Sequence, residues 1–476
     1  MALSPGSTPH AQPHRTTLAT TVCVTTEMRA NSRICRAPDR PHETHISENF
    51  GTPQTSEPLV SNVAIIGSGI TGVTTTYALL ERGHSVTVLD RQRYAAMETS
   101  FANGGQLSAS NAEVWNSWGT ILKGMKWVLR HDAPLLLNPR PSVHKYSWIA
   151  EFIRQIRNYR VNTVATTKLA IEARKHLFDI AEKEGINFDL EKRGILHIYQ
   201  DKTGFEAAAK VNDLLREGGL DRCAVTPEEM RRIEPALHGS YYGGFFTPSD
   251  STGDIHKFTR GLADACMHRG ARFIFEAEVT DIIHRGNDIR ILWRGPDISS
   301  SDETLQFDAV VVCAGVASRR FAAMLGDRLN IYPVKGYSIS VYLDDERSQN
   351  GAPTVSLLDD QAKIVTSRLG RDRLRVAGTA EFNGENRDIR AGRIRPLVDW
   401  TRELFPAVST ARVVPWAGLR PMTPSLMPRI GRGTRPGVFY NTGHGHLGWT
   451  LSAATAQMVA DAVDSEATRK YAERAA

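Results

Sequence analysis

The strongest constraint on the fold is a glycine-rich turn that joins a short apolar run to an amphipathic segment. Residues 63–66 are Val-Ala-Ile-Ile, which is typical of a buried strand, and residues 67–72 read Gly-Ser-Gly-Ile-Thr-Gly before a helical pattern over 73–82. A second apolar run at 86–89 ends at Asp90. This order and spacing predict a parallel β-α-β unit that binds a dinucleotide.

Each residue type in the turn has a physical task. Gly67 permits the tight turn, Gly69 lets the backbone approach a pyrophosphate, and Gly72 lets the helix pack closely on the strand. The positive end of the helix then faces the phosphates, and the carboxylate after the second strand would accept hydrogen bonds from ribose hydroxyls. The predicted contacts of this unit are Gly67, Ser68, Gly69, Ile70, Thr71, Gly72, Asp90 and Arg91.

Two further glycine-rich turns follow apolar runs much later in the chain, at residues 308–315 and 441–450. In the last turn, glycines would let backbone N–H groups approach a planar ring, and the helix predicted over 451–463 would stabilise negative charge on a reduced flavin. Three such turns indicate one extended cofactor, so we expect FAD. The predicted contacts here are Ala314, Gly315, Gly443, Gly445, Leu447, Gly448, Trp449 and Thr450.

Length and composition favour a folded protein of two lobes, because 476 residues exceed what one hydrophobic core usually supports. No apolar run approaches the roughly 18 residues of a membrane span. The net charge of +6 is a small excess of bases, which we interpret as ordinary surface charge without a nucleic-acid partner. The five cysteines form no Cys-x-x-Cys pair, so we expect no metal, no disulfide framework and a non-covalent flavin in a reducing compartment.

Residues 1–60 differ from the rest because they are rich in Thr, Ser, Pro, Arg and His and have no apolar period. Such a composition predicts a disordered tail, or a segment upstream of a start codon at Met28. A secretory or transit role is the weaker alternative, since the apolar stretch 18–24 is interrupted by threonines.

Four motifs, at residues 98–108, 332–338, 416–424 and 442–450, carry a family resemblance that runs from about residue 63 to 463. In them the chain resembles the D-amino-acid oxidase superfamily, and within it the small-subunit type of the bacterial D-amino-acid dehydrogenases. The resemblance implies an α/β fold, α+β overall, with a discontinuous Rossmann-like FAD-binding domain. An inserted substrate domain would place a mainly antiparallel sheet over the flavin.

The resemblance also implies domain boundaries and further contacts. We expect 61–112, 250–328 and 412–465 to form the FAD-binding domain, 113–249 and 329–411 the substrate domain, and 466–476 a C-terminal tail. Alternating patterns at 338–342, 363–367 and 374–378 suit the roof of the flavin site. Four residues would lie in a loop on the flavin, and one would meet the adenine through its backbone: Ser100, Asn103, Gly105 and Gln106, then Val279.

The implied reaction is the oxidative deamination of D-amino acids to 2-oxo acids and ammonium, with hydride passing from Cα to flavin N5. Electrons would go to a quinone or another respiratory-chain acceptor. The aromatic and basic segment 115–148 would then be a peripheral membrane contact, placing the protein in the cytoplasm at the inner face of the bacterial inner membrane, although a substrate-domain helix with a core face explains the same pattern.

Arg420 is the predicted clamp for the substrate carboxylate, because a planar guanidinium can hold a carboxylate through two parallel hydrogen bonds. Tyr337 is a candidate donor to the same carboxylate, and Lys335 a candidate stabiliser of the reduced ring. His444, like His446, would modulate charge at the flavin turn. Each of these three weaker assignments competes with a packing or local hydrogen-bonding role.

Two alternative functions remain open from the residues. The same flavin and arginine would also serve oxidation of a secondary amine such as sarcosine, D-proline or hydroxyproline. A non-catalytic flavin electron-transfer subunit is the alternative from another class, and the retention of Arg420 within its motif argues against it.

Overall fold

A computed structural model describes residues 60–475 apart from 129–133, 287 and 297–301. The tail expected over residues 1–60 therefore lies outside the described residues except for Val60. The two predicted lobes correspond to two sheets within one compact unit.

The first sheet contains the predicted dinucleotide unit. Within the described residues it has six strands in the order β19-β20-β13-β1-β2-β9. β1 pairs in parallel with both β2 and β13, and β13 pairs in parallel with β20. The apolar, β-branched residues of these strands are buried on both faces, as central parallel strands require. The bounds are β1 (Asn62–Ile66), β2 (Ser85–Leu89), β9 (Arg272–Ile274), β13 (Ala309–Val312), β19 (Arg429–Arg432) and β20 (Val438–Thr442).

Different layers cover the two faces of this sheet. On one face, α1 (Ile70–Glu81) and α11 (Gly448–Ala475) pack side by side against the apolar residues of β1 and β13. On the other, a three-stranded antiparallel sheet and α8 (Ser318–Met324) close the core. That sheet consists of β10 (Glu278–Arg285), β11 (Asp288–Arg294) and β12 (Glu303–Phe307). The carboxyl ends of the parallel strands, with their glycine-rich turns, are left at one edge.

The second sheet has nine strands among the described residues, in the order β18-β14-β17-β16-β15-β5-β7-β6, with β4 paired to β17. It is mainly antiparallel, and the strands predicted at 338–342, 363–367 and 374–378 are all confirmed within it. The bounds are β4 (Leu135–Leu137), β5 (Ile195–Tyr199), β6 (Cys223–Val225), β7 (Gly243–Thr247), β14 (Tyr332–Tyr342), β15 (Ser356–Asp359), β16 (Ile364–Leu369), β17 (Arg373–Phe382) and β18 (Val413–Met422).

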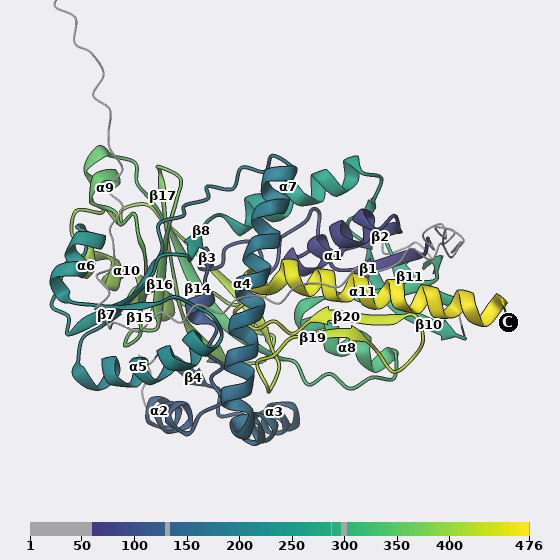
Figure 1. Cartoon of the computed structure of the whole chain (residues 1–476), viewed down its shortest axis with the longest axis horizontal. Helices are drawn as coiled ribbons and strands as arrows, with labels where there is room; N and C mark the ends of the chain where they lie inside the picture. The colour runs from purple at the N-terminus through teal and green to yellow at the C-terminus, as the bar shows by residue number, and fades with distance from the viewer. Residues whose placement is uncertain (1–59, 129–133, 287, 297–301, 476) are drawn as a thin grey trace, which may run out of the picture. The chain divides into compact units, whose positions relative to one another are not determined.

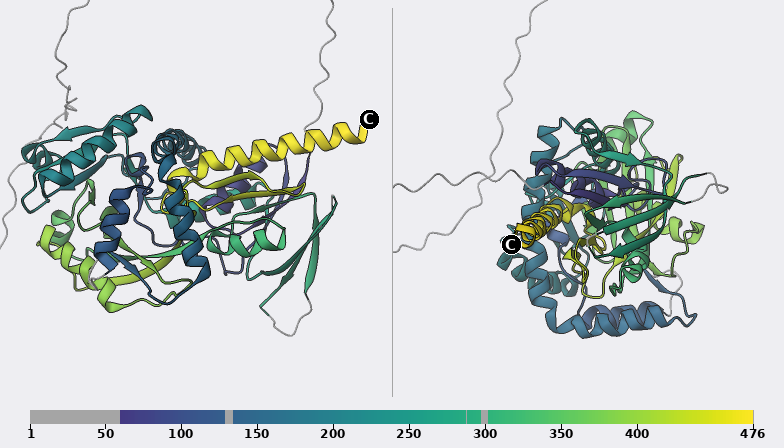
Figure 2. Two further views of the ribbon diagram at one scale, coloured as in Figure 1. Left: turned by 90° about the horizontal axis from the view of Figure 1, so that it is seen from below. Right: turned by 90° about the vertical axis from the view of Figure 1, so that its right-hand side faces the viewer.

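The remaining helices lie around this second sheet, except that α7 packs against α1 and α4 packs against α11 (Figures 1 and 2). Several begin at an acidic or hydroxyl side chain that accepts from the first turn, as Asp201 does for α5 and Asp254 for α7. The helices are α2 (Trp118–Val128), α3 (Val143–Arg154), α4 (Tyr159–Lys183), α5 (Lys202–Glu217), α6 (Pro227–Ile233), α7 (Ile255–His268), α9 (Glu346–Gly351) and α10 (Ala391–Leu404).

Two details depart from the sequence expectations. β18 was expected within the FAD-binding domain, but it pairs along its whole length with β14 and so belongs to the larger sheet. α11 continues to Ala475, through the residues expected as a C-terminal tail. The apolar pattern used for that helix ended near residue 463, and Val463 is also the last residue of the helix that packs in the core beside β1 and β13. Among the described helices, none combines the length and the apolar character that crossing a bilayer demands.

Candidate flavin and substrate site

A cavity of about 950 Å³ lies where the edge of the six-stranded sheet meets one face of the nine-stranded sheet. All three glycine-rich turns line it, although they are as far apart in sequence as Gly67 and Gly448. The predicted contacts that line it are Gly67, Gly69, Ile70, Thr71, Asp90, Arg91, Ser100, Asn103, Gln106, Val279, Ala314, Gly315, Gly443, Gly445, Leu447, Gly448, Trp449 and Thr450.

The first turn has the geometry that its sequence predicts. A Cβ on Gly72 would overlap the carbonyl oxygen of Gly67, and Gly67 itself adopts a φ of +105°. The helix can therefore pack this closely on the strand only because both residues are glycine. Ser68 does not line the cavity; it fixes Asp90 by donating its backbone N–H and its hydroxyl to one carboxylate oxygen, at 2.6 and 2.7 Å. The carboxylate is thus held in place at the end of β2.

The cavity has room and free donors for an extended nucleotide. Beyond Gly69 the nearest atom to an added Cβ is the Ser100 hydroxyl at 3.6 Å, and around Gly315 an added Cβ would meet nothing within 4 Å. Within the described residues, the buried indole N–H of Trp449 has no hydrogen-bond partner. Open space at the turns, the amino-terminal end of α1 and an orphaned donor together fit FAD.

The predicted flavin loop is anchored to the second sheet. The Asn103 side chain accepts from the Gly105 N–H at 2.9 Å, and Gly105 adopts a φ of +75°. Gln106 donates to the Ser356 hydroxyl at 2.8 Å. Gly105 itself does not line the cavity and instead shapes the turn that lets its neighbours do so.

Arg420 projects from β18 into the cavity without an acidic partner among the described residues. Its Nη1 donates to the carbonyl of Thr379 at 3.0 Å. Burial lowers the pKa of Arg420 to about 10, so the guanidinium remains charged at neutral pH. A charged group that is removed from water without a counterion favours an anionic ligand.

Two residues that support Arg420 were not assigned a role from the sequence. Gly336 lies beside it on β14, and a Cβ there would overlap the guanidinium. Thr379, whose carbonyl accepts from Arg420, has a φ of +62°, a strained value for a β-branched residue. The glycine in the 332–338 motif was a usable signal, whereas the strain at Thr379 leaves no trace in the sequence.

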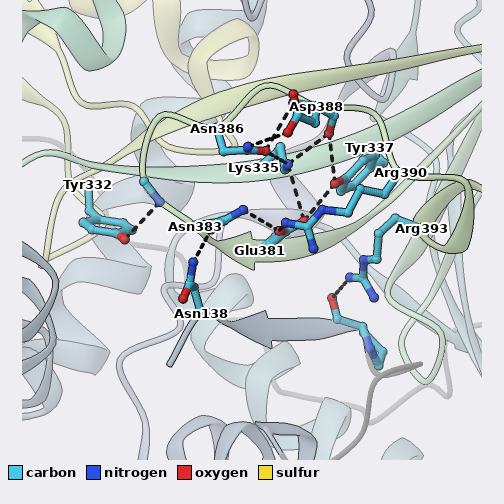
Figure 3. A network of polar contacts seen from close by, with 12 residues as sticks. Asn138, Tyr332, Lys335, Tyr337, Glu381, Asn383, Asn386, Asp388, Arg390 and Arg393 are labelled. Atoms are coloured by element: carbon cyan, nitrogen blue, oxygen red, sulfur yellow. Dashed lines mark hydrogen bonds and ion pairs between the residues drawn. The ribbon is translucent and has the colours of Figure 1, made fainter. Parts of the chain in front are cut away.

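Lys335 and Tyr337 project from the opposite face of β14, because side chains alternate along a strand. Lys335 does not line the cavity; its ammonium donates to the Asn386 side chain at 2.7 Å and lies 3.6 Å from Glu381. Tyr337 lines the cavity, but its hydroxyl donates to Glu381 at 2.8 Å (Figure 3). The structure thus places both polar groups in a network around Glu381, whereas we expected the phenol at the substrate carboxylate and the ammonium near the reduced flavin ring.

Glu381 is the centre of this outer-face network. It is 2% exposed, and besides Lys335 and Tyr337 it contacts Arg390 at 2.5 Å and Asn383 at 3.0 Å (Figure 3). Burial lowers the pKa of the Lys335 ammonium, while Glu381 opposes this shift. The network therefore joins β14 and β17 to the segment before α10.

The two histidines of the last turn line the cavity as neutral rings. Burial lowers the pKa of His444 to about 3 and that of His446 to about 4. His444 is held by the Thr455 hydroxyl at 3.0 Å, and His446 donates to the Asn111 carbonyl at 3.3 Å while stacking on Trp115. At neutral pH neither ring carries the second proton of an imidazolium, so neither bears a positive charge.

Two anchors, the buried Asp250 and the exposed Arg320, were missed because their partners are distant in sequence. Asp250 accepts from the backbone N–H groups of Ala109 and Ser110, both at 3.0 Å, and fixes the wall of the cavity. Arg320 donates to the Val279 carbonyl at 2.9 Å at the end expected for the adenine.

Converging glycine-rich turns, the fit to an extended nucleotide and an unpaired guanidinium define a flavin-dependent oxidoreductase. Residues 62–462 match the family model described as FAD dependent oxidoreductase, DAO, and the chain belongs to this family, whose cofactor is FAD. A relative from Mesorhizobium japonicum named D-amino acid dehydrogenase 3 is 66% identical over 404 residues, which cover 85% of this chain and 97% of the relative. A D-amino acid dehydrogenase from Paramagnetospirillum magneticum is 41% identical over 408 residues, or 84% and 94% of the two chains.

Solved structures share the fold at lower identity. Glycine oxidase from Geobacillus kaustophilus has a TM-score of 0.65 at 23% identity, with 85% of this chain and 95% of that chain covered. L-proline dehydrogenase from P. horikoshii has a TM-score of 0.66 at 17% identity, with coverages of 86% and 94%. The expected α/β FAD-binding fold is thereby confirmed.

Proposed function

We propose that the protein catalyses the FAD-dependent oxidative deamination of D-amino acids to 2-oxo acids and ammonium. The names of the two relatives above support this substrate class. The observation that carries the proposal is Arg420, a charged guanidinium in the cavity wall whose N–H donors are not satisfied by an acid of the described chain. An amino acid offers the carboxylate that such a group selects.

The residues of the chain orient the substrate and exclude water. Arg420 binds the α-carboxylate, and the roof strands β14 and β17 cover the site, which strengthens that ion pair. His444 and His446 remain neutral, so they add no charge that would compete for the carboxylate. FAD, which the glycine-rich turns around Gly67 and Gly443 would hold, would supply the acceptor for the hydride that leaves Cα.

The test is an anaerobic mixture of the purified yellow protein with D-alanine. We expect the visible absorbance of the flavin to bleach, and we expect L-alanine to bleach it far more slowly. The same assay with sarcosine, D-proline and hydroxyproline examines the secondary amines. If no amino acid or amine bleaches the flavin, the protein is not the proposed enzyme.

We further propose that the electrons pass to a quinone or another respiratory-chain acceptor, with the protein in the cytoplasm and bound peripherally at the inner face of the bacterial inner membrane. Exposed apolar side chains on α2 and α3 support a surface contact: Trp118, Leu122, Val143 and Tyr146. The two helices lie along the lower edge of the ribbon in Figure 1. Of the basic and aromatic residues expected to share this surface, the side chains of Lys123, Lys126, Trp127 and Arg130 lie outside the described set, and Lys145 is buried.

A flotation assay with anionic phospholipid vesicles tests the membrane contact. We expect the wild type to float with the vesicles and Trp118→Ser with Leu122→Ser to float less, while activity with a soluble dye stays the same. Equal flotation of both proteins would contradict the contact. Quinone reduction without peroxide formation is the expected result for the acceptor.

A further inference from the structure

The cavity continues well beyond Arg420, along one face of the nine-stranded sheet. Directly paired residues share a face, so one row of side chains can be followed from strand to strand. The row begins at β18 and ends at β7, and all of its members except the last line the cavity: Trp416, Ser338, Ala377, Val365, Leu358, His197 and Phe245. The far end therefore belongs to the same cavity as the carboxylate clamp.

Arg222 lies at this far end as a buried cation with an unpartnered donor. It is 4% exposed, its guanidinium lies 4.7 Å from the centre of the Phe245 ring, and it lines the cavity. Within the described residues its Nε has no hydrogen-bond partner and the guanidinium forms no ion pair; one Nη donates to the Tyr199 hydroxyl at 3.4 Å. A buried cation with unused donors fits an anionic ligand.

Glu113 faces the same part of the cavity. One of its carboxylate oxygens accepts from the Tyr159 hydroxyl at 2.6 Å, and no base of the described chain pairs with it. Burial raises the pKa of this carboxyl group. Of the other charges at this end, Lys363 and Asp360 pair with each other, and Lys210 of α5 is an exposed side chain at the cavity wall. Besides this exposed lysine, the far recess thus holds one unpaired acid, Glu113, and one unpaired buried base, Arg222, the complement of a zwitterion.

The length of the cavity decides which zwitterion fits. Four strand spacings separate β17 from β7. The Thr379 carbonyl of β17 accepts a hydrogen bond from Arg420, and the Phe245 ring of β7 lies against the guanidinium of Arg222. At about 4.8 Å for each spacing this is about 19 Å along the sheet, of which the two guanidinium groups and their hydrogen bonds occupy part. The side chain of an alanine or aspartate is too short to bridge the remainder.

We infer that the far recess binds the second head of an elongated D-amino acid whose side chain ends in another α-amino carboxylate. Arg222 holds the far carboxylate and Glu113 the far ammonium, while Arg420 holds the carboxylate next to the reacting Cα. This inference rests on the proposed function and adds a substrate class to it.

A length series with the wild-type holoenzyme tests the inference without any substitution. The substrates are D-alanine, D-aspartate, D-glutamate, D-2-aminoheptanedioic acid and meso-2,6-diaminoheptanedioic acid. We expect KM to fall toward the seven-carbon compounds and to be lowest for the one with two heads. If D-alanine is oxidised but KM does not fall with length, the recess has no such role; if D-alanine is not oxidised, the proposed function itself has failed.

Substitutions then separate the two contacts. Arg222→Met should raise KM for both seven-carbon substrates about 10- to 100-fold, the value of a hydrogen bond to a charged group, and leave kcat/KM for D-alanine unchanged. Glu113→Gln should raise KM for the diamino compound alone. Arg216→Met, at an exposed position on α5, is the matched control. Equal losses on D-alanine and the long substrates would assign Arg222 a structural role and overturn the inference.

Discussion

The two faces of β14 use charge in opposite ways. On the cavity face, Arg420 of the neighbouring strand lies over Gly336 and has no acidic partner in the described chain. On the outer face, Lys335 and Arg390 share the buried carboxylate of Glu381 (Figure 3). A charge that the fold satisfies stabilises the protein, whereas a charge that the fold leaves unsatisfied marks the place of a ligand.

The substitution Arg420→Met tests the cavity face and has the largest expected effect. We expect kcat/KM for D-alanine to fall about 100- to 1,000-fold, because loss of one partner of a buried charged pair costs about 3 to 4 kcal/mol. FAD content should stay the same. Arg420→Lys, which keeps the charge but not the planar fork, should recover part of the loss. Unchanged kinetics in the methionine variant would show that Arg420 does not bind the substrate.

Glu381→Ala tests the outer face. We expect the free energy of unfolding, measured by urea titration, to fall by about 3 kcal/mol, since Lys335 would remain buried without its counterion. The flavoprotein that stays folded should keep its KM. Glu385→Ala, at an exposed position in the same segment, should change stability by less than about 0.5 kcal/mol. A rise in KM with unchanged stability would contradict the distinction between the faces.

Gly336→Ala asks whether the cavity face depends on a missing side chain. The added Cβ would overlap the Arg420 guanidinium, so we expect kcat/KM to fall about tenfold, or about 1.4 kcal/mol, with FAD still bound. Gly392→Ala, where an added Cβ meets nothing within 4 Å, is the control. Full activity of the first variant would mean that the guanidinium binds substrate from another position.

Tyr337→Phe has the smallest expected effect. It removes the hydroxyl that donates to Glu381, which should lower the free energy of unfolding by about 1 kcal/mol. We expect kcat/KM to stay within error of the wild type, as judged by steady-state assays with an artificial dye. A clear loss of activity at wild-type stability would support the original expectation that this phenol contacts the substrate.

The comparison also separates what the sequence predicts from what it does not. The β-α-β unit could be predicted in detail because Gly67, Gly69, Gly72 and Asp90 act within one local motif. Arg420 could be chosen by its chemistry and by family resemblance. The placement of Lys335 and Tyr337 could not be predicted. Their motif indicates a strand, but it does not indicate which of the two faces of that strand lines the cavity.

Contacts between residues that are distant in sequence set a second limit on what the sequence predicts. The pairing of β18 with β14, and with it the position of Arg420, depends on contacts between segments some 80 residues apart, and no local pattern encodes them. The far recess shows the same limit, since Glu113 and Arg222 are about 110 residues apart in sequence and line one cavity only in the folded chain. Sequence patterns identified the parts of the site, and the registers of the sheet determined which parts face each other.

One backbone contact has a consequence for how such an enzyme could change its substrates. β18 is joined to the flavin turn by a hydrogen bond from the Gly445 N–H to the Pro421 carbonyl, at 3.0 Å, and by a bridge between Met422 and His444. Main-chain atoms therefore set the reach from the clamp to the reactive ring. Replacing side chains near this backbone contact would leave that distance unchanged. Directed evolution of substrate selectivity should therefore begin with the residues that line the opposite end of the cavity.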